Sequence, residues 1–151
     1  MKPAIKHICK VVEHKWYVLV ASMRIGSSIW LALKHDLSKF SLVEIKGYSK
    51  QFYTNEKGSI EWDVAWKHHW MHNKHHWQYW GSGLKNDEYF LPMSKKHALE
   101  MIADWMAASR AYSGTWNLDK WLSGHWGKIK LHLKTREFVK QILTRMGYQV
   151  G

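Results

Sequence analysis

The sequence predicts an all-α protein, a single compact helical domain of about six helices spanning residues 1–151. Apolar residues recur at three- and four-residue spacing through most of the chain, and no segment alternates apolar and polar residues as a strand would. Cap and stop residues separate these periodic segments. A hydrophobic content of 46% with 11 tryptophans excludes an intrinsically disordered chain.

The first predicted helix runs from Pro3 to about Met23, with proline suited to its first turn. Its apolar stripe comprises Ile5, Ile8, Val12, Trp16 and Leu19, and the opposite side carries His7, Val11, His14, Val18 and Ala21. Because both sides are largely apolar, we expect both to be buried. We also expect Cys9, which has no partner for an internal disulfide, to be a small buried residue of this helix.

A second apolar helix is predicted over Ile25 to Leu33, after a break at residues 26–28. Ser41 followed by Glu44 has the spacing of a capping box, which predicts a third helix ending near Tyr53. A fourth helix is predicted from Ile60 or Glu61 to the stop signal Gly81-Ser82-Gly83, and it includes all of Trp62 to Trp80.

After a connector from Leu84 to Met93, Ser94 is expected to cap a helix over Lys95 to Tyr112. Its predicted core stripe is Ala98, Ile102, Trp105 and Ser109. Residues 115–134 show the least regular pattern. The last predicted helix runs from about Thr135 to Met146, with Phe138, Ile142, Leu143 and Met146 inward and Gly147 as its stop signal.

The segment from Trp62 to Trp80 carries five histidines and five tryptophans, far more imidazoles than packing requires. Histidine is the commonest metal ligand. On a helical wheel His69, Asn73 and His76 fall within roughly 60° of each other. His72 lies at the edge of that face, His68 is expected at the surface, and His75 turns inward only if the helix ends early.

A second element of the site is His35-Asp36, with Lys39 three residues after the aspartate (H-D-x-x-K). Adjacent residues diverge on a regular helix, but at a helix end both side chains can bind metal ions that share the carboxylate. Together with His14 upstream and Asp104 on a later helix, this pattern predicts a His/Asp metal site.

The order His14, His35-Asp36, His69, His75-His76 and Asp104 resembles the HD-domain metal-dependent phosphohydrolase superfamily, over roughly Lys6 to Arg110. Residues 115–151 would be a C-terminal extension. The segment from His75 to Gly83 is similar to H-H-x-x-x-x-G-x-G of the cyclic-dinucleotide phosphodiesterase branch, and Ile102 to Trp105 resembles the segment that holds the last ligand in other members. The whole chain also looks like a small uncharacterised bacterial and phage family marked by H-K-x-Y-V, H-D-L-S-K-F, N-K-H-H-W and A-D-W.

The resemblance implies an HD-like fold and a mono- or dinuclear metal site, with one or two Fe, Mn, Co, Ni or Zn ions. It implies a first metal at His14, His35, Asp36 and Asp104, with Asp36 bridging to a second metal at His69 and His76. His7 is the alternative to His14, and His75 the alternative to His76. Lys39 would steady a phosphate or the hydroxide, and Asn73 would contact substrate or orient a ligand.

The activity implied is hydrolysis of a nucleotide or related phosphate ester, with Trp77 and Trp80 as candidates for base stacking. An alternative is the diiron oxygen chemistry of a few HD-fold oxygenases. A second alternative is a basic nucleic-acid-binding module with a structural metal, because the chain has a net charge of +11.

We expect a cytoplasmic protein without a membrane partner. The longest apolar run, Trp16 to Met23, is too short to span a bilayer, and the N-terminus lacks the apolar core of a signal peptide.

Overall fold

The computed structural model describes residues 1–81 and 90–151, and its helices confirm the all-α class. Within this part of the chain the α-helices are α1 (Pro3–Ile25), α2 (Ile29–Lys34), α3 (Leu42–Tyr53), α4 (Ile60–His72), α5 (Lys95–Ser113), α6 (Asp119–His125) and α7 (Leu133–Arg145). Short 3-10 helices are η1 (Leu37–Phe40), η2 (Trp77–Trp80) and η3 (Trp126–Lys128). The described residues contain no strand beyond an isolated bridge between Gly81 and Phe90.

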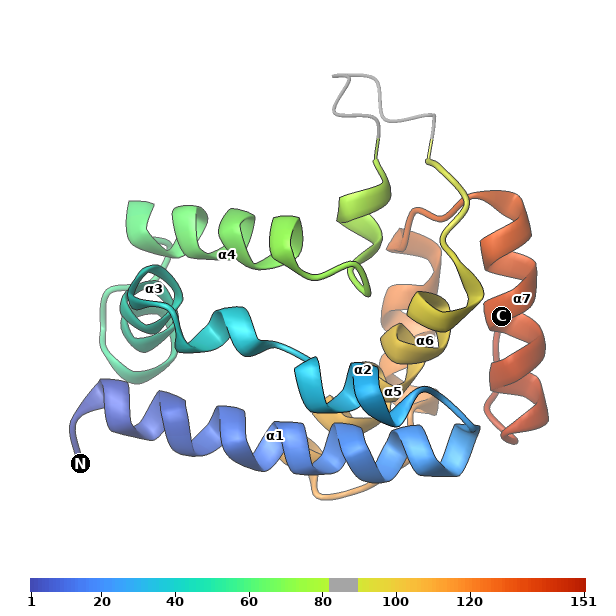
Figure 1. Cartoon of the computed structure of the whole chain (residues 1–151), viewed down its shortest axis with the longest axis horizontal. Coiled ribbons are helices and arrows are strands. Elements are labelled where there is room, and N and C mark those ends of the chain that lie inside the picture. The colour runs from blue at the N-terminus through green and yellow to red at the C-terminus, as the bar shows by residue number, and fades with distance from the viewer. Residues whose placement is uncertain (82–89) are drawn as a thin grey trace.

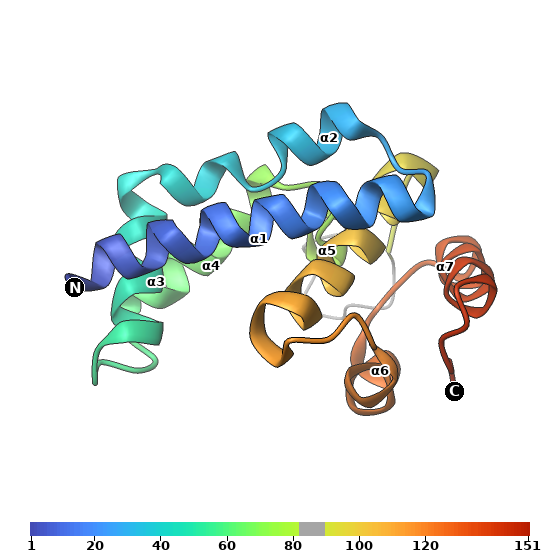
Figure 2. The same cartoon turned by 90° about the horizontal axis from the view of Figure 1, so that it is seen from below.

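Helix α1 runs the length of one side of the molecule, with α2 beside it and α3 at its N-terminal end (Figures 1 and 2). It ends at Gly26, which adopts the left-handed conformation (φ 70°) that glycine tolerates best. Ser28 then caps α2 by accepting a hydrogen bond from the backbone N–H of Leu31.

The prediction that both sides of α1 are buried is wrong. The buried side carries His7, His14 and Val18, whereas Trp16 on the predicted apolar stripe is 61% exposed. The buried side packs against α5 and α3, and no element among the described residues covers the outer stripe at Trp16. Cys9 is also exposed, contrary to expectation.

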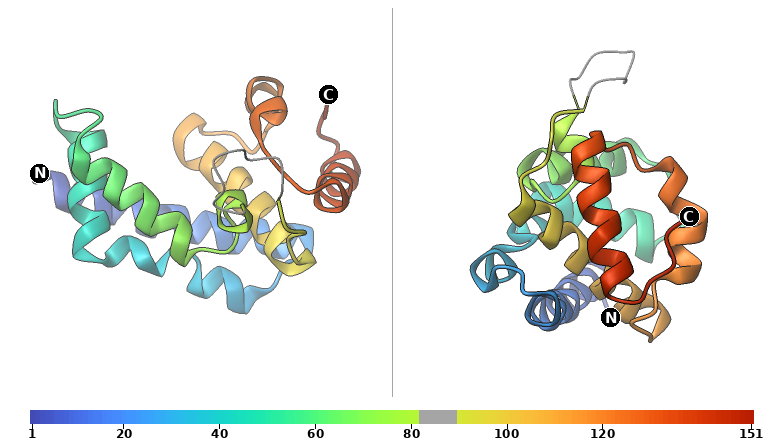
Figure 3. Two further views of the ribbon diagram at one scale, coloured as in Figure 1. Left: turned by 90° about the horizontal axis from the view of Figure 1, so that it is seen from above. Right: turned by 90° about the vertical axis from the view of Figure 1, so that its right-hand side faces the viewer.

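Helices α3 and α4 pack closely together at the end of the molecule opposite α7 (Figures 1 and 3). Gly47 permits this approach, because a Cβ atom there would lie 2.3 Å from Ala65 Cβ and 2.3 Å from the Glu61 carbonyl oxygen. Ser41 caps α3 as predicted, accepting from the Glu44 N–H at 3.3 Å. The Glu44 carboxylate is fully buried and contacts histidines of α4 instead of completing a capping box.

The predicted continuous helix from residue 60 to residue 80 is wrong, because α4 ends at His72. Asn73 has extended backbone angles, and η2 begins only at Trp77. Gly81 follows η2, whereas Ser82 and Gly83 of the predicted stop signal and residues 84–89 of the connector lie outside the described residues.

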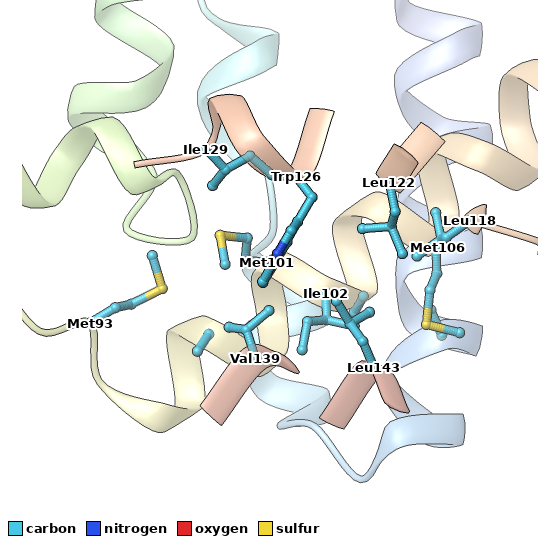
Figure 4. Packing of buried hydrophobic residues seen from close by; sticks show 13 residues of the cluster. Met93, Met101, Ile102, Met106, Leu118, Leu122, Trp126, Ile129, Val139 and Leu143 are labelled. Atoms are coloured by element: carbon cyan, nitrogen blue, oxygen red, sulfur yellow. The ribbon is translucent and has the colours of Figure 1, made fainter. Parts of the chain in front are cut away.

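The main apolar core lies among α5, α6, η3 and α7 (Figure 4). Ala98 and Ile102 of the predicted α5 stripe are buried there, but Trp105 and Ser109 are only partly buried, and Met101 and Met106 contribute more. Residues 115–134, the least predictable segment, supply Leu118, Leu122, Trp126 and Ile129. The C-terminal segment therefore completes the main core.

Helix α7 packs against α5 chiefly through Val139 and Leu143, which are both fully buried. The other predicted inward residues, Phe138, Ile142 and Met146, are partly buried against the same core. Gly147 ends the helix region with φ 85°, as its sequence position predicted. Among the described residues, no helix is long and apolar enough to cross a membrane.

Candidate metal centre

The centre is built around the junction of α2 and η1, where His35 and Asp36 are adjacent. His35 caps the C-terminus of α2, and Asp36 adopts the left-handed conformation at φ 55°. Aspartate tolerates this conformation better than most residues. The change of direction buries both side chains, 1% and 0% exposed, and brings the His35 Nε2 atom 3.4 Å from Asp36 Oδ2.

The first group of potential ligands comprises His14, His35, Asp36 and Asp104, the four residues predicted for a first metal. His14 extends from α1 and Asp104 from α5, and their Nε2 and Oδ1 atoms lie 2.9 Å apart. Asp104 Oδ1 also lies 3.3 Å from His35 Nε2. The Asp36 oxygen that faces this group is Oδ2, 3.9 Å from His14 Nε2.

The second group comprises Asp36, His69, His75 and His76. Asp36 Oδ1 lies 3.5 Å from His69 Nε2 and 3.4 Å from His75 Nε2. His76 joins through its Nε2 atom, 2.8 Å from His69 Nε2. The two oxygens of one buried carboxylate therefore face two different sets of histidines.

These separations fit metal coordination. Ions with bonds of about 2.0–2.2 Å hold neighbouring ligand atoms about 2.9–3.6 Å apart in octahedral or tetrahedral geometry. Asp36 Oδ1, His35 Nε2 and His75 Nε2 are buried atoms that make no hydrogen bond with the described residues. Such atoms are costly unless something pairs with them, and the mixed N/O donor set suits a divalent transition metal.

Carboxylates behind the histidines orient the imidazoles. Glu100 Oε1 lies 3.1 Å from His35 Nδ1 and 3.3 Å from His75 Nδ1. Glu44 Oε2 lies 2.9 Å from His69 Nδ1. An Nδ1–H that donates to a carboxylate leaves Nε2 unprotonated toward the centre, as metal-binding histidines require. Glu100 also forms a third compact group with His35 and His75.

The electrostatics of the centre differ from one potential ligand to the next. Burial lowers the pKa of His14 and His69, and burial together with neighbouring imidazoles lowers the pKa of His76, so these rings stay neutral. Burial alone would raise the pKa of Asp36, but neighbouring imidazoles and the Lys39 ammonium hold it well below its usual range. Burial also acts to lower the pKa of His35, but the Asp36, Asp104 and Glu100 carboxylates raise it well above its usual range, so they favour a positive charge at this position.

Lys39, on η1, lies against the centre, with Nζ 2.7 Å from Asp36 Oδ2. Burial acts to lower the pKa of Lys39, but Asp36 and Asp104 outweigh burial and raise it, which keeps the ammonium charged. Asn73 is buried on the far side of His69, where its amide donates to Ser38 Oγ and to the His69 carbonyl, each at 2.7 Å. Its position suits orienting His69.

The positions of the other histidines show which of them lie close enough to the centre to be metal ligands. His14 belongs to the first group, whereas His7 Nε2 lies 3.2 Å from the Lys39 carbonyl oxygen and joins neither group. His75 belongs to the second group together with His76, because α4 ends early. His72 is exposed. His68, expected at the surface, is partly buried with Nδ1 2.7 Å from Glu44 Oε1.

Sequence reasoning missed Glu44 and Glu100 as partners of the site. Glu44 has the spacing of a capping-box residue, which concealed its contact with His69. Glu100 lies four residues before Asp104 on α5, one helical turn away and thus on the same side of the helix. This spacing was the signal in the sequence that could have identified Glu100.

A cavity of about 160 Å³, which we call the polar cavity after the charged side chains in its lining, opens beside the first group. His14, Lys39 and Asp104 line it where it meets the centre, and Lys10, Tyr48 and Tyr112 line its outer part. The centre is thus accessible to a small molecule from the side that carries Lys39.

No curated protein and no solved structure matches the chain. Residues 4–145 match a family of unknown function, DUF5662. The match covers nearly the whole chain, from α1 to the end of α7. The chain therefore belongs to the DUF5662 family of unknown function.

Proposed function

We propose that this protein is a metal-dependent phosphohydrolase that acts on a small phosphate ester such as a nucleotide. A first divalent transition-metal ion would be held by the first group, His14, His35, Asp36 and Asp104. A second ion, if present, would be held by the second group, Asp36, His69, His75 and His76.

The observation that carries the proposal is the position of the Asp36 carboxylate. It is fully buried, with Oδ2 facing the first group and Oδ1 facing the second. A carboxylate placed between two sets of imidazoles would suit a site that holds two metal ions. When bound, two such ions would polarise phosphoryl oxygens and lower the pKa of an attacking water.

The chain's own cations suit an anionic substrate. Lys39 is charged, lies at the inner end of the polar cavity and can bind a phosphoryl oxygen there. Lys10 lines the same cavity, and the net charge of +11 attracts anions to the surface. The order of the site residues along the chain is the one that the HD-domain resemblance implies, which supports an activity of the HD-domain kind.

Metal analysis of the purified protein, followed by a phosphate-release screen over nucleotides and simple phosphate esters, tests the proposal. We expect bound Fe, Mn, Co, Ni or Zn and phosphate release that Asp36→Ala abolishes together with the metal. The matched control is Asp63→Ala, which removes an exposed carboxylate of α4 outside the metal groups.

If Asp36→Ala retains its metal and its activity, the proposal is wrong. Oxygen consumption that requires iron would instead support the oxygenase alternative. Salt-sensitive nucleic-acid binding without phosphate release, retained in a Lys39 variant, would support the binding module.

A further inference from the structure

A second cavity, of about 290 Å³, opens beside the second group of potential ligands, whereas the polar cavity opens beside the first group. His75 and His76 line it at the centre, and its walls include the indole rings of Trp66, Trp77 and Trp105. Trp121 and His125 of α6 also line it. We refer to it as the tryptophan cavity.

The tryptophan cavity has aromatic walls from three separate parts of the chain. Trp105 and Trp121 have ring centroids 5.2 Å apart, which joins α5 to α6 across the cavity lining. Trp66 meets His76 edge to face at 5.3 Å, beside the second ligand group. These rings contact one another at the spacings that aromatic pairs prefer, and Trp121 also stacks on His125 with ring centroids 4.6 Å apart. The aromatic residues that line the cavity offer apolar surface to another planar ring. Trp80, also considered for stacking, instead donates its indole N–H to the Lys74 carbonyl.

Two polar atoms of residues that line the tryptophan cavity have no hydrogen-bond partner among the described residues: His75 Nε2, which faces the metal centre, and the Gln78 amide oxygen. The Gln78 amide oxygen is buried and accepts no hydrogen bond from the described residues, and Gln78 lines the tryptophan cavity. A buried acceptor of this kind is normally satisfied. A ligand with an N–H group at the edge of a ring would satisfy it, as nucleobases do when an amide reads their edge.

The polar cavity and the tryptophan cavity differ in size and in the kind of group that each can hold. The tryptophan cavity, at about 290 Å³, reaches the lower end of the range of small-molecule sites, whereas the polar cavity is about 160 Å³. The polar cavity carries Lys39 and Lys10 and suits a phosphoryl group. Asp104 lines the polar cavity and the next residue, Trp105, lines the tryptophan cavity, so both adjoin one centre.

We propose that the tryptophan cavity binds a nucleobase, packed against Trp121 and Trp105 and hydrogen-bonded to the Gln78 amide oxygen. The inference rests on the proposed function in one respect: it makes this base part of the substrate whose phosphate lies at the metal centre. It narrows the substrate class from phosphate esters in general to nucleotides.

Equilibrium binding of adenosine, guanosine, cytidine and uridine to the full chain as purified tests the site without any phosphate or turnover. We expect at least one nucleoside to bind saturably. Trp121→Leu should weaken that binding by about 5- to 150-fold, the range for loss of one base–aromatic contact. Gln78→Leu should weaken it by about 5- to 10-fold through the lost hydrogen bond. Trp30→Leu, which removes an exposed tryptophan of α2 outside the cavity, should leave it unchanged.

Absence of binding by all four nucleosides would overturn the base site, and so would binding that neither variant weakens. If Trp121→Leu fails to fold, as judged by circular dichroism, Gln78→Leu decides the matter alone. The two proposals fail separately: nucleoside binding without phosphate release refutes only the hydrolase, and release of phosphate without nucleoside binding refutes only the base site.

Discussion

Replacing Glu100 by glutamine tests whether buried carboxylates tune the metal centre from behind its histidines. Glu100 is 5% exposed, and its oxygens lie within 3.3 Å of the Nδ1 atoms of His35, His75 and His97. Burial alone would raise the pKa of Glu100, but these imidazoles hold it well below its usual range, so the group is ionised at neutral pH. Glutamine keeps the size but loses the charge and turns an N–H₂ group toward an imidazole N–H.

The expected magnitude follows from which histidines Glu100 contacts. Loss of such an outer partner typically weakens metal affinity 10- to 100-fold, about 1.4–2.7 kcal/mol. His35 belongs to the first group and His75 to the second, so Glu100→Gln should weaken the binding of a metal ion at each group. Glu44→Gln is the matched comparison, because the one potential metal ligand that Glu44 contacts is His69 of the second group. This substitution should therefore weaken metal binding at the second group and leave the first group unchanged.

Isothermal titration with a competing chelator, together with metal content after dialysis, measures both affinities. Equal effects of Glu100→Gln and Glu44→Gln on the two ions, or no effect of either, would refute the assignment of outer partners. Complete loss of both ions in Glu100→Gln alone would show that Glu100 is itself a metal ligand, as its compact group with His35 and His75 allows.

Two further predictions concern catalysis and folding. Lys39→Met should lower the rate of phosphate release by about 10²- to 10³-fold, as for loss of one transition-state donor. Metal affinity measured on the same sample should stay unchanged or rise, because a cation 2.7 Å from Asp36 is removed; full activity would contradict the role of Lys39. Gly47→Ala should lower the free energy of unfolding by about 1–3 kcal/mol, since the new Cβ would meet Ala65 at 2.3 Å. Gly124→Ala, within α6 with no atom near its new Cβ, should raise the free energy of unfolding by about 0.5–1 kcal/mol. Urea denaturation measures both glycine variants, and effects of the same sign would contradict the packing argument.

Helix positions were predictable where a local signal marks them. Ser41 caps α3 through its own side chain, and Gly147 takes a left-handed conformation after α7. Both effects act within one turn of helix, so the residue type alone reveals them. The end of α4 carries no such signal. It lies at Asn73, whose amide bonds to Ser38 on η1, a contact over 35 residues that no helical wheel contains.

The choice of buried face on α1 likewise depended on the tertiary structure. Both sides of α1 are apolar, and only packing against α5 and α3 makes the side with His14 the inner one and leaves Trp16 in solvent. Hydrophobic periodicity identifies candidate faces but does not rank two faces of similar composition.

By itself, the sequence determined the helical class and four side chains that meet in the first group, His14, His35, Asp36 and Asp104. The four side chains were implied by the resemblance to the HD-domain superfamily, which rests on the order of residue types along the chain. The tertiary structure decided that His75 joins the second group, and that Glu44 and Glu100 support the histidines. These assignments depend on contacts between residues far apart in the sequence, which form only when the helices pack.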